Sequence, residues 1–355
     1  MPSRGEMFSG TAPVRERHRF DQAALQRYMQ ANVEGFTGRL EVQQFRGGQS
    51  NPSYLLTTGS QRYVVRRKPP GPLLPSAHAV DREHRIITAL QGSGVPVPRT
   101  YALCDDASVI GTAFYVMEYV EGRIFWDAPL PEQAPDERAA IYDASIDVLA
   151  TLHGVDYQAV GLGNFGNPGN YFARQVSRWT RQYRASETEP IPAMERLIAW
   201  LPQNIPEDDT TTIVHGDFHL NNLIFHPEEP RVVAVLDWEL STLGHPLADL
   251  AYHCLPWRLP PDPLDGVKGI DIAALGIPTE QQRLAAYCRR TGRDRIDHWD
   301  FSMVFTMFRL AAIMQGIAYR AVEGTASSEE AVVMGARARP LAEHASALLQ
   351  TLTGG

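Results

Sequence analysis

One stretch of the chain places an acid, an amide and a histidine at a spacing that suits phosphoryl transfer. Within residues 213–225, His215 stands two positions before Asp217, and Asn222 follows five positions after it. A carboxylate such as Asp217 can orient an acceptor hydroxyl and take its proton. The side-chain oxygen of Asn222 is a hard ligand of the kind that Mg²⁺ prefers. We therefore expect a loop that carries a catalytic base, Asp217, with His215 orienting it.

A second acid follows a second apolar run. The segment Val232–Leu236 reads as a buried strand, and Asp237 comes directly after it. Phosphoryl transfer gives the protein little covalent chemistry to perform and depends on positioning and on neutralising charge. We expect Asp237 to share Mg²⁺ with Asn222, while Asp217 faces the acceptor hydroxyl.

A glycine-containing turn in the first part of the chain could hold the phosphates of a nucleotide. Gly47 and Gly48 lie between two predicted strands, and Ser50 and Asn51 follow them. Backbone amides in such a turn, together with the Ser50 hydroxyl, can contact phosphate oxygens. Glycine-rich hairpin turns are common, so this turn predicts a nucleotide site only in combination with the acidic residues.

Two longer motifs resemble the aminoglycoside phosphotransferase and choline kinase-like family, whose fold is similar to that of protein kinases. The family's catalytic loop reads H-G-D-x-x-x-x-N, as residues 215–222 do here, and its metal motif begins with an acid after a strand, as at Asp237. The resemblance implies ATP or GTP as phosphoryl donor and Mg²⁺ as cofactor. It also implies that Asp249 lies in a helix that braces the catalytic loop.

The resemblance extends to the cation that holds the phosphates. Related kinases have a lysine where this chain has Arg66, and Glu83 matches the acidic partner of that cation. Arginine can hold phosphate with two parallel hydrogen bonds, so the replacement is compatible with function. Because Arg67 and Lys68 follow, the sequence leaves open which of the three reaches the nucleotide.

The order of predicted elements gives an α+β chain with two lobes. We expect an N-terminal arm at residues 1–20, a small antiparallel-sheet lobe with one helix at 21–119, and a larger, mostly helical lobe at 120–355. The resemblance implies that the backbone of Glu118, Tyr119 and Val120, between the lobes, binds the nucleotide base. Main-chain contacts have no side-chain signature, so ATP and GTP are not distinguished.

Departures from protein kinases favour a small acceptor. Gly216 stands where protein kinases have arginine, and no A-P-E segment follows. Asp237 is followed by Trp238 and Glu239 where protein kinases have Phe-Gly. The runs 66–85 and 237–251 resemble the phosphotransferase-like branch of the family that also occurs fused to acyl-CoA dehydrogenases. That branch implies a hydroxyl of a hydroxy acid, or of a hydroxyacyl-CoA, as the acceptor.

Composition limits the partners. The 355 residues are 44% hydrophobic and 21% charged with a net charge of -8, which is typical of a globular chain and argues against nucleic acid or an anionic membrane as partner. No secretory leader and no uncharged apolar span of membrane length is expected. Cys104, Cys254 and Cys288 have no paired spacing, which favours reduced thiols in the cytoplasm. The sequence leaves the oligomeric state open.

Two other functions fit parts of the pattern. The alternation of His215, Asp217 and His219 could hold a metal ion in a metal-dependent hydrolase, but the sequence offers no clean second pair of ligands. Arg66 in place of lysine fits a non-catalytic kinase-like protein that only binds nucleotide. Such a binder has no need of the base Asp217, which favours the enzyme.

Overall fold

The computed structural model describes residues 9–47, 51–71, 78–324 and 331–353. The chain divides into two compact units, of which the first comprises residues 1–126, 158–162 and 220–241, and the second residues 127–157, 163–219 and 242–355. The first unit continues beyond the expected boundary at residue 119. It also takes in the segment at residues 220–241, from much later in the chain.

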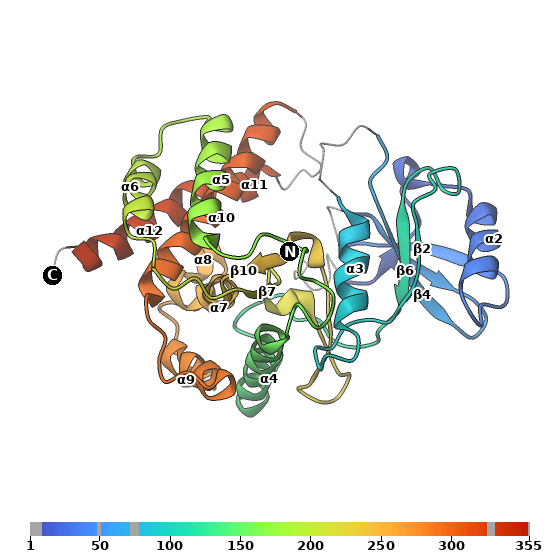
Figure 1. The fold of residues 1–355 in the computed structure, drawn as a ribbon, viewed down its shortest axis with the longest axis horizontal. Helices are drawn as coiled ribbons and strands as arrows, with labels where there is room; N and C mark the ends of the chain where they lie inside the picture. Colours follow the sequence, from blue (N-terminus) through green and yellow to red (C-terminus); the bar gives the residue numbers. More distant parts are fainter. Residues whose placement is uncertain (1–8, 48–50, 72–77, 325–330, 354–355) are drawn as a thin grey trace. The chain divides into compact units, whose positions relative to one another are not determined.

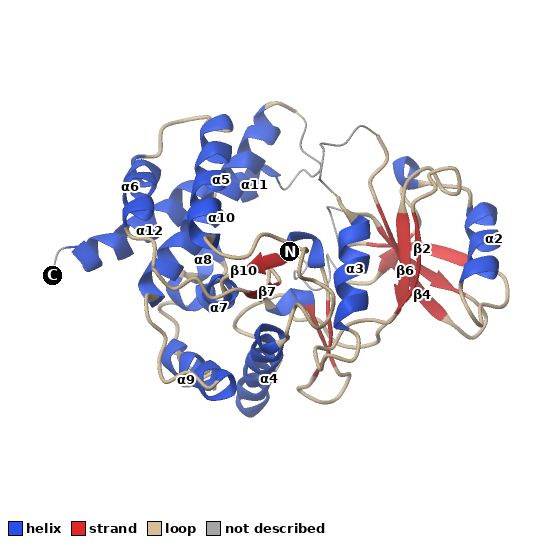
Figure 2. Ribbon diagram, in the orientation of Figure 1, coloured by secondary structure: helices blue, strands red, loops and turns tan. Residues whose placement is uncertain are grey.

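A six-stranded antiparallel sheet forms the centre of the first unit (Figure 2). The strand order is β1-β2-β3-β4-β6-β5. The strands are β1 (Thr11–Ala12), β2 (Glu41–Phe45), β3 (Ser53–Thr57), β4 (Arg62–Arg67), β5 (Thr100–Cys104) and β6 (Phe114–Glu118). The α+β class and the antiparallel sheet are therefore as the sequence predicts.

Two helices, α2 (Gln22–Asn32) and α3 (Val80–Leu90), cover opposite faces of this sheet (Figure 1). Successive side chains of a strand point to opposite faces. Along β4, Val65 packs in one apolar cluster with Leu25 of α2, whereas Arg66 contacts α3. This alternation decides which basic residue of β4 faces which helix.

Residues 11–20, which the sequence assigns to a separate arm, are joined to the sheet. Thr11 pairs with Phe45 of β2, and the ring of Phe20 meets that of Tyr54 edge-on, with 5.0 Å between the ring centroids. The Tyr54 hydroxyl donates a hydrogen bond of 3.0 Å to the His18 carbonyl. These contacts tie the segment down, because they satisfy an edge strand and bury aromatic area.

Strands β8 (Leu223–Phe225) and β9 (Val232–Val235) form an antiparallel hairpin that belongs to the first unit. Phe225 and Arg123 exchange two backbone hydrogen bonds of 2.8 Å. A Cβ at Gly122 would lie 2.1 Å from the Phe225 carbonyl oxygen, so only glycine fits there. The hairpin is therefore joined by backbone contacts to the segment after β6.

The second unit is mostly helical. Its helices are α4 (Pro135–Gly154), α5 (Tyr171–Ala185), α6 (Pro192–Trp200), α7 (Pro246–Cys254), α8 (Pro261–Leu264), α9 (Glu280–Thr291), α10 (Trp299–Val322), α11 (Ala331–Gly335) and α12 (Ala338–Thr353). Two short strands, β7 (Thr212–Val214) and β10 (Thr242–Gly244), pair antiparallel. Strand β7 leads into the catalytic loop, and β10 leads into α7.

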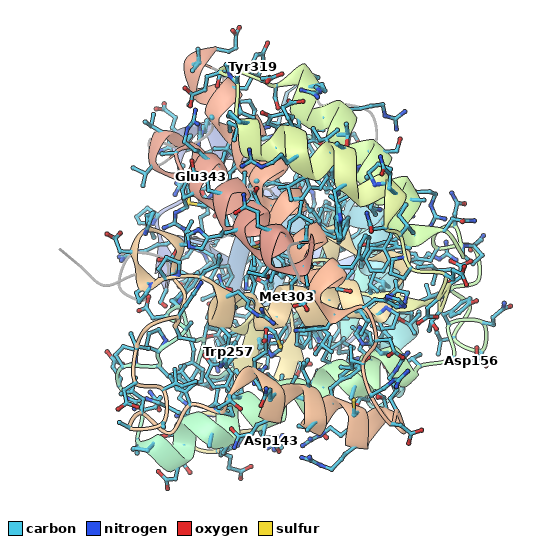
Figure 3. The ribbon with its side chains drawn as sticks, turned by 90° about the vertical axis from the view of Figure 1, so that its left-hand side faces the viewer. Asp143, Asp156, Trp257, Met303, Tyr319 and Glu343 are labelled. Carbon is cyan, nitrogen blue, oxygen red and sulfur yellow. The ribbon has the colours of Figure 1, made fainter. Side chains whose placement is uncertain are left out.

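Helix α10 is the core of this unit. It packs against α5, α7, α11 and α12, and Figure 3 shows its Met303 among the helices. Its 24 residues are long and apolar enough to cross a membrane, but 78% of the apolar stretch is buried within the protein. A helix that is apolar on all sides and covered by its neighbours is typical of a domain core.

Candidate active site

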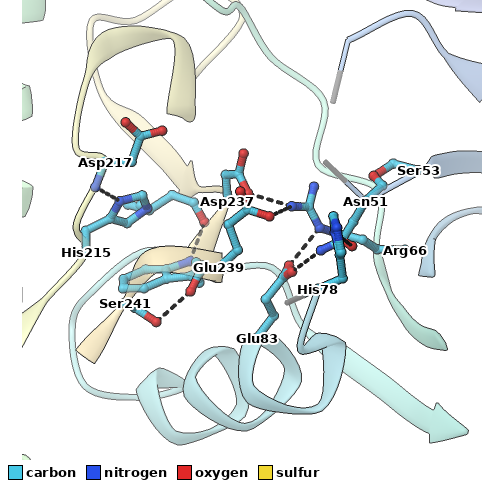
Figure 4. A network of polar contacts seen from close by, with 12 residues as sticks. Asn51, Ser53, Arg66, His78, Glu83, His215, Asp217, Asp237, Glu239 and Ser241 are labelled. Carbon is cyan, nitrogen blue, oxygen red and sulfur yellow. Dashed lines mark hydrogen bonds and ion pairs between the residues drawn. The ribbon is translucent and has the colours of Figure 1, made fainter. Parts of the chain in front are cut away.

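The first unit contains a buried cation surrounded by carboxylates (Figure 4). The Nε of Arg66 lies 2.7 Å from an Oε of Glu83, and one terminal nitrogen donates to an Oδ of Asp237 at 2.5 Å. The same nitrogen lies 3.7 Å from a carboxylate oxygen of Glu239. The side chain of Arg66 is 8% exposed and that of Glu83 1%, so the central pair is shielded from water. The ion pair expected between Arg66 and Glu83 is thus present.

A second layer of polar groups fixes Glu83. Asn51 donates from its side-chain amide to Glu83 at 2.7 Å, and the Tyr115 hydroxyl donates to the other carboxylate oxygen at 3.1 Å. The side-chain oxygen of Asn51 lies 3.0 Å from a ring nitrogen of His78. The side chain of Asn51, which the sequence assigns to the nucleotide, is therefore engaged in positioning Glu83.

The cluster carries more negative than positive charge. Burial raises the pKa of Glu83, and the neighbouring carboxylate of Asp237 raises it further. For Arg66, burial opposes the charged form, but Asp237 and Glu83 outweigh it and hold the guanidinium pKa above its ordinary value. With Glu239 as a third carboxylate, one guanidinium balances only part of the charge. A divalent cation with oxygen ligands fits such a surplus.

The two predicted metal ligands come together at one end of the β8–β9 hairpin. Asn222 precedes β8 and Asp237 follows β9, and the Leu236 N–H donates to the Asn222 carbonyl at 2.8 Å. Asp237 itself has φ of 64° and ψ of 60°, in the left-handed region that asparagine and aspartate tolerate better than other side chains. In this backbone conformation, the carboxylate of Asp237 forms its ion pair with Arg66.

The structure separates the three basic residues at 66–68. Arg67 lies on the other face of the sheet, where it donates to the Ile110 carbonyl at 3.2 Å and lies over the ring of Phe20. Lys68 is partly exposed, 3.9 Å from Asp81. Arg66 is the cation beside Glu83 and Asp237. It is therefore the candidate for the phosphates.

The other predicted nucleotide-contacting segments are placed only in part. Gly47 comes shortly after β2, whereas Gly48 and Ser50 lie outside the described residues. Glu118 ends β6, and its carboxylate accepts the Arg99 N–H at 3.1 Å. Among the described residues, no backbone hydrogen-bond partner is found for residues 119–120, after β6.

In the second unit, Asp249 holds the backbone of the catalytic loop. Its carboxylate accepts the N–H of His215 at 2.5 Å and that of Gly216 at 2.8 Å. Gly216 has φ of 85°, which glycine adopts without strain. Burial would raise the pKa of Asp249, but His153, 3.5 Å away, and the donated hydrogen bonds hold it below its ordinary value. Helix α7, which begins with Pro246, supplies this anion in its first turn.

Asp217 is the partly exposed acid of the same loop. Its N–H donates to the Nδ1 of His215 at 3.2 Å (Figure 4), and its carboxylate lies 3.3 Å from the Nε2 of His219. The Tyr252 hydroxyl is a further hydrogen-bond donor to this carboxylate. Burial opposes the charge, but His219 and Tyr252 outweigh it and hold the pKa of Asp217 well below its usual range. The acid is therefore ionised at neutral pH.

The alternation of His215, Asp217 and His219 is used within the loop. His215 is fully buried, with its Nδ1 accepting a backbone N–H, and His219 pairs with Asp217. Within the described part of the chain, no group of three or more His, Cys, Asp or Glu side chains is arranged to hold a metal ion.

Comparison with known proteins gives the family. A sequence profile described as "Phosphotransferase enzyme family" (APH) matches residues 41–297. The chain belongs to this family. A crystal structure of a Ralstonia eutropha protein, described as a candidate aminoglycoside phosphotransferase, is 54% identical with a TM-score of 0.86, and the match covers 94% of this chain and 99% of that one.

Two further relatives of this phosphotransferase bear on its fold and on its branch of the family. An aminoglycoside phosphotransferase in a complex with ADP and hygromycin B is 14% identical, covers 92% of this chain and 98% of its own, and has a TM-score of 0.60, which shows the shared kinase-like fold. Acyl-CoA dehydrogenase family member 10 of Mus musculus is 50% identical over 336 residues, 94% of this chain and 31% of that protein. This chain thus spans about a third of the mouse relative. The predicted family and its dehydrogenase-associated branch are confirmed.

Two residues of the phosphotransferase's catalytic region do not follow from its motifs. Tyr252 lies three positions after Asp249 on α7, so helical spacing could have placed both on one face. Arg309 of α10 donates to the Gly216 carbonyl at 2.6 Å and lies over the rings of Trp179 and Tyr252. An arginine in the middle of an apolar helix is the signal that sequence reasoning could have used.

Proposed function

We propose that this phosphotransferase moves the terminal phosphoryl group of ATP or GTP, with Mg²⁺, to a hydroxyl of a small molecule. The observation that carries the proposal is the cluster around Arg66. There, Asp237 lies at the same hairpin end as Asn222 and contacts the cation that Glu83 holds. This combination supplies oxygen ligands for a divalent cation beside a guanidinium suited to phosphate.

The first unit is the proposed nucleotide site. Arg66 would hold phosphate oxygens, and Asn222 and Asp237 would hold Mg²⁺, which would neutralise part of the phosphate charge. The backbone groups of Tyr119 and Val120 are suited to the edge of the base. A relative of the same fold that binds ADP supports a nucleotide donor.

Asp217 is the proposed base. Its partners keep the carboxylate ionised at neutral pH, so it can accept a hydrogen bond from the acceptor hydroxyl, orient it and take its proton as the phosphoryl group is transferred. His219 and Tyr252 fix the orientation of the carboxylate, and Asp249 with Arg309 fixes the loop backbone on which it stands. A protein that only bound nucleotide would have no use for an acid held in this way.

A hydroxy acid or hydroxyacyl-CoA is the proposed acceptor. The support is the association of the 50% identical mouse relative, by its name, with acyl-CoA dehydrogenation. This part of the proposal rests on the relative alone, since about two thirds of that protein has no counterpart in this chain.

Thermal unfolding with and without nucleotide tests the donor site. The midpoint is measured with ATP, GTP and ADP, each with and without Mg²⁺, because a ligand that binds only the folded state raises the midpoint. We expect a magnesium-dependent rise that Asp237→Ala abolishes. Asp105→Ala, which removes an exposed acid of the same unit, should leave the rise unchanged. The absence of a rise with every nucleotide would contradict the proposal.

A further inference from the structure

Helix α5 of the second unit carries a row of arginines. Arg174, Arg178, Arg181 and Arg184 stand at intervals of four, three and three residues, and no aspartate or glutamate occurs between Tyr171 and Ala185. Residues at these intervals lie along one side of a helix. The chain as a whole has a net charge of -8, so this local concentration of positive charge runs against the overall balance.

The arginines differ in how their charges are balanced. Arg184 forms ion pairs with Glu195 and Glu187. Arg174 donates to backbone carbonyls of the segment before α5. For Arg178 and Arg181, no ion pair with a carboxylate is found in the described part of the chain. Two exposed guanidinium groups therefore stand without a countercharge, beside a third that contacts only neutral oxygens.

These groups line a hollow in the surface of α5. The hollow has a volume of about 560 Å³ and is lined by Arg174, Arg178 and Arg181 together with Ala173, Gln175 and Ser177. Ser177 adds a hydroxyl donor to the guanidinium groups. Arginine's planar fork matches phosphate better than a point charge does. A ligand of this hollow is therefore expected to carry phosphate or pyrophosphate.

The hollow lies on a helix that packs against α10, and α10 carries Arg309. Trp179 of α5 is buried, and its ring lies beneath Arg309, which donates to the carbonyl of Gly216. The guanidinium of Arg178 lies 5.3 Å from the centroid of the same indole. The indole of Trp179 thus contacts both Arg178 of the row and Arg309, the cation that holds the loop of Asp217.

We propose that Arg174, Arg178 and Arg181 form a binding site for a phosphate-bearing part of the acceptor. The inference rests on the proposed function, since it needs an acceptor, and it narrows that acceptor to an anion. A polycationic acceptor, such as an aminoglycoside, would be repelled by this row.

Pyrophosphate binding tests the site without any need for turnover. Isothermal titration calorimetry is performed with inorganic pyrophosphate, in saturating Mg·ADP so that the nucleotide site is filled. The double variant Arg178→Glu/Arg181→Glu reverses the charge at two positions of the row. The matched control is Arg27→Glu/Arg289→Glu, which makes the same charge change at two exposed arginines elsewhere. We expect binding that the row variant weakens at least tenfold and the control leaves within twofold.

Equal affinity in the row variant and the control, or no binding to the unaltered protein at millimolar pyrophosphate, would overturn the proposal. Kinetics then separate it from the proposed function. With hydroxylated acceptors that do or do not carry phosphate, the row variant should raise KM for the phosphate-bearing ones and leave KM for Mg·ATP unchanged. Pyrophosphate binding by a protein that shows no nucleotide-dependent thermal shift would contradict the kinase and leave the anion site standing.

Discussion

The cluster around Arg66 in the first unit and the catalytic loop in the second solve the problem of buried charge in opposite ways. In the first, one guanidinium is placed among the carboxylates of Glu83, Asp237 and Glu239. In the second, the carboxylate of Asp249 accepts hydrogen bonds from two backbone N–H groups and lies 3.5 Å from the ring of His153. Side chains in an ion pair can exchange partners when a charged ligand binds. A carboxylate that accepts backbone N–H groups fixes the conformation of the loop that donates them.

The two regions are suited to different roles. The cluster has a surplus of negative charge and a cation that phosphate could recruit, so it is suited to a ligand that brings its own charges. The loop has its ionised acid, Asp217, held by His219 and Tyr252, so it is suited to act on a bound hydroxyl without rearrangement. Substitutions in the cluster should therefore act mainly on nucleotide binding, and substitutions in the loop should act mainly on turnover.

The largest effect is expected from Asp217→Asn. Loss of a positioned base typically lowers the rate by about 10²–10⁴-fold. We expect kcat to fall in that range while the nucleotide-induced rise in unfolding midpoint is retained. Steady-state kinetics and thermal unfolding of the same preparation measure both. Turnover close to that of the unaltered protein would mean that the loop does not supply the base.

Arg66→Ala should act on stability and on nucleotide binding together. It leaves Glu83 buried without its countercharge, and breaking a buried pair from one side costs about 3–5 kcal/mol. Chemical denaturation measures the loss in free energy of unfolding. Arg66→Lys is the matched variant that keeps a positive charge. We expect lysine to recover more stability than alanine and to restore part of the nucleotide response. Equal behaviour of the two variants would show that the charge at this position is unimportant.

Asp249→Asn tests whether the loop is held by its carboxylate. An amide has one acceptor oxygen in place of two, so one of the N–H groups of His215 and Gly216 loses a charge-assisted hydrogen bond, at a cost of about 2 kcal/mol. The midpoint of guanidinium unfolding should fall, and kcat should fall with KM for Mg·ATP unchanged. Asp294→Asn, at an exposed position, is the control. A change confined to nucleotide binding would erase the contrast between the two regions.

The smallest effect is expected from His219→Gln, and it concerns pH. His219 is the main group that holds the pKa of Asp217 down. A carboxylate with a lowered pKa stays ionised until the pH falls through that value, so activity that needs the charge is lost there. The stability that it contributes is lost progressively as the pH falls from the ordinary carboxyl pKa to the lowered one. Without His219 that pKa rises, so the acid limb of the pH dependence of kcat should move to higher pH. An unmoved limb would assign it to another group.

The sequence by itself determined the family and much of the fold, and it supplied the residues of the proposed chemistry. Asp217, Asn222 and Asp237 are recognisable because each follows or precedes an apolar run at a fixed spacing, which is local information. The antiparallel sheet and the helical second part follow from the same periodicities. The family follows from two motifs that are each contiguous in the chain.

Tertiary structure decided what local spacing leaves open. Arg66 and Arg67 are equivalent in sequence, and only the packing of α3 and α2 on opposite faces of the sheet gives the first to Glu83. Arg309 reaches Gly216 across 93 positions, and the hairpin after Asn222 joins the first unit through Arg123. Such contacts depend on which elements pack together, and the pattern within any one element does not contain that information.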